Sequence, residues 1–95
     1  MMNVAPQNKL TDEQVERLVI AINDLQVTNI MAQIIWRALE KAEGIEAKRK
    51  ILVTAFAQSY ELMVVMNMAV NSDMKPALFA ANLKELKRLS HARVN

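Results

Sequence analysis

The first long pattern in the chain is a row of mostly apolar positions separated by alternating steps of three and four residues. Its members are Val15, Leu18, Ile22, Leu25, Asn29, Ala32, Trp36 and Leu39. Such a seven-residue repeat is typical of a helix that packs lengthwise on another helix. We therefore expect one helix over residues 11–42, with Thr11 and Gln14 forming a capping box at its start.

After Gln26, apolar residues also occupy the other faces of this expected helix. They are Val27, Ile30, Met31, Ile34 and Ile35. A helix that is apolar nearly all round is covered by neighbours on more than one side. The pattern therefore predicts that the second half of the first helix is central in the fold and that its first half is more peripheral.

The length of this helix leaves two arrangements open. A straight helix over 11–42 would be roughly 48 Å long, whereas a compact domain of this size has a radius of gyration of only about 13 Å. Either the helix breaks near residues 27–29, or the molecule is an elongated bundle with a second chain alongside. We favour elongation, because the repeat passes through Asn29 without a change of phase.

Asn29 is the polar member of the apolar row. A buried Asn is costly unless its amide is paired, and the same residue of a second copy would supply that pairing and fix the register of a dimer. The alternative is that the helix turns at this point and Asn29 contacts solvent or a backbone group. Both alternatives remain open at the level of sequence.

Two more helices follow. Gly44 stands where a left-handed residue would end the first helix, and Pro76 suits the first turn of the last one. We expect helices over about 45–71 and 75–91, the former with a seam of Leu52, Phe56, Ser59, Met63, Met66 and Val70.

The predicted fold is all-α: a flexible lead at 1–10, then a single bundle domain at 11–92. The bundle has three helices, or four if the first helix breaks, and the first two form a long antiparallel hairpin. The single Gly and two Pro of the chain agree with this, because sheets and tight turns use both residues heavily.

Composition adds an expectation about function. Hydrophobic residues make up 53% of the chain, more than so small a body readily covers by itself. We therefore expect a homodimer, which also binds another protein. Methionine is abundant, and flexible thioethers suit a face that adapts to a partner. The expected contact residues are Asn29, Ile30, Ile34, Trp36, Met63, Met66 and Val70.

Residues 51–70 are long enough to cross a membrane and carry a single charge, Glu61. A carboxylate at the centre of a span offsets several aliphatic residues. We therefore expect a buried bundle helix and no membrane span. The chain has no cysteine, which excludes disulfides and agrees with a cytoplasmic location.

A cluster of basic residues near the end of the chain supports an alternative function. Lys84, Lys87, Arg88 and Arg93 could contact phosphates, which would make the protein a small nucleic-acid-binding regulator. However, cations are favoured near any helix C-terminus, and the net charge of +2 is small for a nucleic-acid-binding domain. We favour a solvated helix face.

The sequence offers little for catalysis. It contains a single histidine, and it has neither a glycine-rich phosphate loop nor a Glu-x-x-His spacing. We expect no catalytic residue, no cofactor and no metal site. The predicted function is that of a non-catalytic interaction protein: an adaptor, small chaperone, inhibitor or assembly factor.

Overall fold

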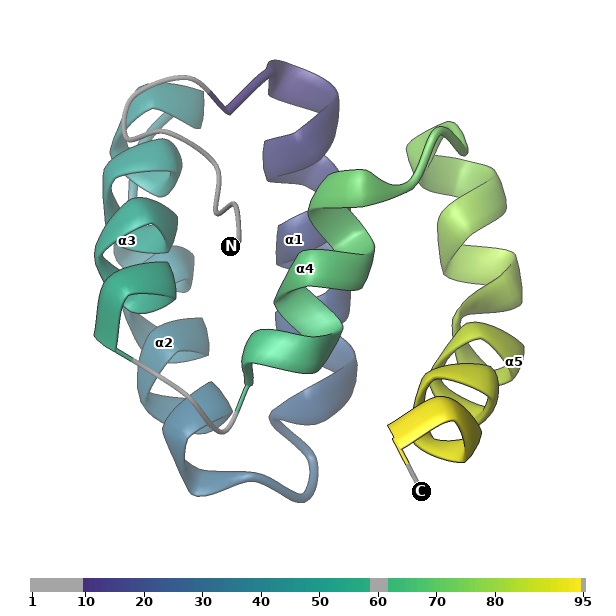
Figure 1. Cartoon of the computed structure of the whole chain (residues 1–95). Helices are drawn as coiled ribbons and strands as arrows, with labels where there is room; N and C mark the ends of the chain where they lie inside the picture. Colours follow the sequence, from purple (N-terminus) through teal and green to yellow (C-terminus); the bar gives the residue numbers. More distant parts are fainter. Residues whose placement is uncertain (1–9, 59–61, 95) are drawn as a thin grey trace.

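The computed structural model describes residues 10–58 and 62–94, where it shows helices and no strand (Figure 1). The helices are α1 (Asp12–Leu25), α2 (Ile30–Lys41), α3 (Ile45–Gln58), α4 (Met63–Asn71) and α5 (Pro76–Val94). The all-α prediction is confirmed. In this described part, however, the chain forms five helices instead of the expected three or four.

Helix α1 begins at the predicted capping box. The Thr11 hydroxyl accepts a hydrogen bond from the Gln14 backbone N–H at 3.1 Å, and the Gln14 side-chain oxygen accepts one from the Thr11 N–H at 2.8 Å. Asp12 and Glu13 in the first turn complement the helix dipole. The start of the helix is therefore fixed by local interactions.

The continuous helix expected over 11–42 is wrong, because α1 ends at Leu25 and α2 begins at Ile30. Asn29 has an extended backbone, and its side-chain oxygen accepts a hydrogen bond from the Ala32 N–H at 3.0 Å. Asn29 is thus the N-cap of α2 and contacts a backbone group. Asn is among the strongest N-cap residues, and β-branched Val27 and Thr28 are weak helix formers, so the break has local causes that the heptad phase does not show.

The helix expected over 45–71 is also divided, into α3 and α4, and the seam residue Ser59 lies outside the described residues. Helix α2 packs against α3, and α1 packs against α4. Gly44 has a φ of 89° in the short connection between α2 and α3. At the other end, α5 starts at Pro76, close to the predicted position.

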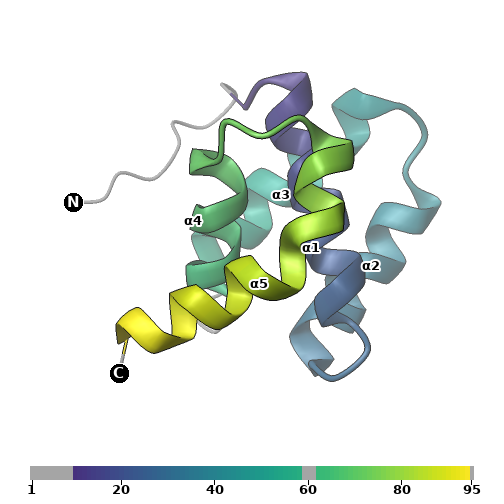
Figure 2. The same ribbon diagram turned by 90° about the vertical axis from the view of Figure 1, so that its right-hand side faces the viewer.

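Helix α1 packs against each of the other four helices and is the centre of the fold. Figure 1 shows α3 on one side of it and α5 on the other, and in Figure 2 α5 lies in front of it. The prediction that residues after Gln26 form the central part is therefore wrong. The elongated bundle is wrong as well, since the extents are 35 × 27 × 25 Å and the radius of gyration is 12.3 Å.

A buried arginine joins α4 to this central helix. Arg17 on α1 is only 4% exposed. Its guanidinium donates hydrogen bonds to the carbonyl oxygens of Ala69 at 2.7 Å and Met74 at 2.9 Å, and Gln14 donates to that of Val70 at 3.1 Å. Because the last carbonyls of a helix lack partners within it, Arg17 stabilises the end of α4 and the connection to α5.

Candidate interaction surface

Large apolar side chains that remain exposed are concentrated at the start of α2. The exposed set in the described chain is Val27, Ile30, Met31, Ile34, Val64 and Leu78. Ile30 and Ile34 lie one helical turn apart and are 73% and 57% exposed. We call these two residues the α2 ridge. Val27 precedes the ridge in the α1–α2 connection and is 71% exposed, which extends the exposed apolar surface beyond the helix.

A groove of about 290 Å³ adjoins the ridge between α2 and α3. It is lined by Met31, Ile34, Ile35 and Ala38 from α2 and by Ile51, Thr54, Ala55 and Gln58 from α3. None of these lining residues carries a charge. Ile34 belongs to both the ridge and the groove, so the two apolar surfaces meet at this residue.

The contact residues expected from the sequence do not form one surface. Ile30 and Ile34 are exposed, whereas Met66 is fully buried and Val70 is 8% exposed. Trp36 and Met63 are half-buried. Met66 and Val70 are buried because α4 packs directly on α1. At these two positions, the apolar seam predicted for residues 45–71 belongs to the core of this chain and is not available for contact with a partner.

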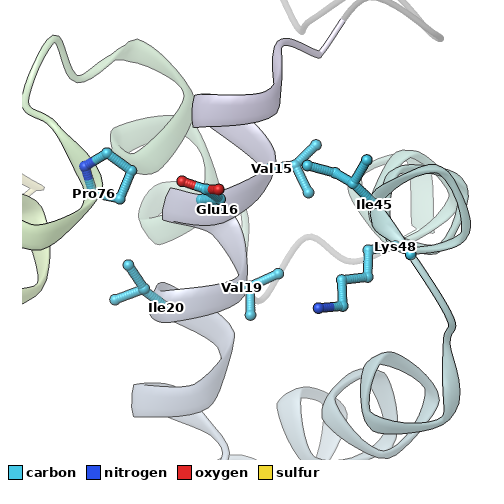
Figure 3. Close-up of a pocket in the computed structure, with 8 residues that line it drawn as sticks. Val15, Glu16, Val19, Ile20, Ile45, Lys48 and Pro76 are labelled. Atoms are coloured by element: carbon cyan, nitrogen blue, oxygen red, sulfur yellow. The ribbon is translucent and has the colours of Figure 1, made fainter.

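A second groove, of about 450 Å³, crosses α1 between α3 and the start of α5. Figure 3 shows Val15 and Val19 pointing toward α3 and Ile20 pointing toward Pro76. Its lining is Val15, Glu16, Val19, Ile20, Gly44, Ile45, Lys48 and Pro76. This groove is not predicted by the heptad row, because Val19 and Ile20 are apolar residues that fall outside the row on the same helix.

Some charged residues around this second groove form ion pairs within the chain, and others do not. Glu13 pairs with Lys75 at 3.0 Å, and Arg49 pairs with Asp12 at 2.5 Å. Within residues 10–58 and 62–94, Glu16 and Lys48 have no ion pair. An acidic and a basic side chain of the groove are therefore available to an external partner.

The basic residues of α5 are partly engaged within the chain. Lys84 and Arg88 are exposed, and Arg88 forms an ion pair with Glu85 at 2.5 Å. The hydrogen bond from Arg88, together with its charge, lowers the pKa of Glu85 below its ordinary value. The side chains of Lys87 and Arg93 lie outside the described set. Glu85 therefore partly neutralises the charge of Arg88 within the chain.

Among the described residues, no group of three His, Cys, Asp or Glu side chains is placed to hold a metal ion. Over the same part of the chain, no helix has both the length and the apolar character needed to cross a membrane.

Comparison with protein-family models, with curated proteins and with solved structures gives no match to this chain. The function is therefore inferred from the surfaces of the chain itself.

Proposed function

We propose that the chain is a non-catalytic interaction protein that forms a homodimer through the α2 ridge and the adjoining α2–α3 groove. The observation that carries this proposal is the exposure of Ile30 and Ile34, at 73% and 57%, beside a groove whose lining is uncharged.

The cost of leaving this surface in water supports the proposal. Burying a large aliphatic side chain contributes about 1.5–3 kcal/mol of favourable free energy. In the monomer, Val27, Ile30 and Ile34 are mostly exposed and do not provide most of this stabilisation. Contiguous exposed apolar patches are typical of interaction sites, whereas single exposed residues such as Leu78 are common on any protein. The α2 surface is therefore the strongest candidate for a protein contact.

The shape of the surface favours a second copy as the occupant. A two-fold interface uses the same patch on both subunits, so the patch must be complementary to itself. Ile30 and Ala38 each lie four residues from Ile34 along α2. An antiparallel pair of α2 helices centred on Ile34 sets Ile30 of each copy against the small Ala38 of the other.

The charge distribution also suits a two-fold arrangement. Residues near the axis meet their own copies, so a charge in that place would repel itself. The groove lining has no charge, and the charged residues of α2, which are Arg37, Glu40 and Lys41, all follow Ile34. In the antiparallel pair these charges lie beside the uncharged start of the other α2 helix.

Sedimentation velocity over a range of micromolar concentrations tests the proposal. We expect a dimer for the parent chain and a monomer for Ile34→Glu, because the glutamate would be buried without a partner. Leu78→Glu is the matched control: Leu78 is 52% exposed on α5, so this variant should remain dimeric. Circular dichroism should show unchanged helix content in both variants, since each position is exposed.

A parent chain that is monomeric at every concentration would overturn the proposal. So would an Ile34→Glu variant that still dimerises, or a Leu78→Glu variant that dissociates equally.

A further inference from the structure

We propose that the groove across α1 binds an amphipathic helix of a partner protein, in a direction fixed by Glu16 and Lys48. We call it the α1 groove, with the lining given above. This goes beyond dimer formation, because it assigns a second surface to a different partner.

The floor of the α1 groove is apolar and comes from three elements. Val15, Val19 and Ile20 are on α1, Ile45 is on α3, and Pro76 begins α5. A volume of about 450 Å³ is in the range of sites that take a ligand or a short row of side chains. A helix lying in such a groove presents apolar anchors three or four residues apart.

The two charged residues of the groove supply the direction. Figure 3 shows the Lys48 side chain extending from α3 toward Val19, while Glu16 lies on the Pro76 side of α1. Neither has an ion pair among the described residues, although the nearby Glu13 and Arg49 do. A partner helix with an acidic residue toward Lys48 and a basic residue toward Glu16 satisfies both charges.

The position of Lys48 is not explained by the stability of its own helix. It lies three residues after Ile45, the first residue of α3. Cations are unfavourable near a helix N-terminus, where the dipole attracts negative charge. Arg49 has the carboxylates of Asp12 and Glu46 to offset that effect, whereas Lys48 has no ion pair in the described chain. Complementarity to an external acidic group accounts for Lys48.

Other occupants fit less well. A nucleic acid or an anionic membrane would be attracted by Lys48 and repelled by Glu16. A second copy placed across a two-fold axis would set one hollow against another and leave both apolar floors uncovered. A helix with an apolar stripe between one acidic and one basic flank is complementary to the floor and to both charges.

The test uses a displayed library of helical peptides selected against the full chain. We expect the enriched peptides to have an apolar stripe with acidic residues on one flank and basic residues on the other. The double variant Glu16→Lys with Lys48→Glu should enrich the opposite arrangement. For a single enriched peptide, the double variant should weaken binding about two- to fivefold, in keeping with partly exposed ion pairs. Reversing the charges of the peptide should restore it.

Two further variants keep the outcome decisive. Val19→Asp places a charge on the floor and should weaken the same peptide more than about tenfold. Ile34→Glu, on the other surface, should leave peptide binding unchanged, so failure of the dimer does not affect this result. Thermal unfolding and circular dichroism should show that each variant is folded.

The proposal is overturned if no peptide is enriched above background. It is also overturned if the enriched pattern ignores the charge reversal, or if Ile34→Glu abolishes binding while Val19→Asp does not.

Discussion

Helices α1 and α2 share one heptad pattern, but they differ in how much of their apolar surface is buried in the fold. Helix α1 carries more charged residues and is nevertheless the central helix, in contact with all four others. Helix α2 is the more apolar of the two and yet exposes Ile30 and Ile34. The number of apolar residues on a helix indicates how much apolar surface must be buried. The neighbouring helices decide how much of that surface is buried within the chain.

The difference arises from where the later helices pack. Helices α4 and α5 both return to α1, and Arg17 and Gln14 bind the carbonyl groups at the end of α4. Among the described helices, α2 has only α1 and α3 as principal neighbours. Ile30 and Ile34 on its outer face stay exposed, and in our proposal a second copy covers them.

The largest expected effect comes from truncating matched aliphatic residues on the two helices. Leu18 on α1 is completely buried, so Leu18→Ala should lower the free energy of unfolding by about 2–5 kcal/mol. Ile34→Ala on α2 should lower the free energy of unfolding by less than about 0.5 kcal/mol in dilute solution. The position is exposed in the monomer, and at low concentration dimer formation does not contribute to stability. Urea unfolding followed by circular dichroism measures both.

Equal losses for these two variants would contradict the assignment of α1 as the central helix. A loss at Ile34→Ala that appears only at high protein concentration would instead sharpen the contrast, because it would link the α2 surface to the dimer.

The next effect concerns the buried arginine that holds α4 on α1. Arg17→Met keeps an aliphatic stem but removes the hydrogen bonds to Ala69 and Met74. We expect a loss of about 2–3 kcal/mol in the free energy of unfolding, since the carbonyl groups lose a charged donor. Arg17→Lys should recover part of the loss, because an ammonium does not reproduce the fork of a guanidinium. If Arg17→Met is as stable as the parent, these hydrogen bonds do not fix α4.

A smaller effect than at Leu18 or Arg17 is expected at the boundary between α1 and α2. Asn29→Ala removes the N-cap of α2 and should lower the free energy of unfolding by about 1 kcal/mol. Asn29→Asp should retain most of the stability, because its carboxylate also accepts from the Ala32 N–H. A thermal melt of both variants measures the difference. An Asn29→Ala variant with unchanged stability would show that α2 does not depend on this cap.

Several features of the fold are predictable from short stretches of sequence. The capping box at Thr11 and the start of α5 at Pro76 match local expectations. Gly44 has the expected positive φ, but it does not end the first helix, because α2 ends at Lys41 and Gly44 lies directly before α3. Much of the heptad row is also in the core, including Val15, Leu18 and Leu39. Ile30, Ile34 and Met66 were all expected contact residues, and only the first two are exposed. This difference in burial was not predictable, because all three side chains are apolar.

The sequence by itself determined where helices begin and which positions need cover, because caps and periodicity act over a few residues. Only the tertiary structure decided that α1 is central, that Arg17 is buried and that the α1 groove exists. Arg17 and the carbonyl of Ala69 are separated by 52 residues in sequence, so no local pattern links them. Two helices, α2 and α3, lie between α1 and α4 in the chain, so their contact depends on the packing of the whole fold.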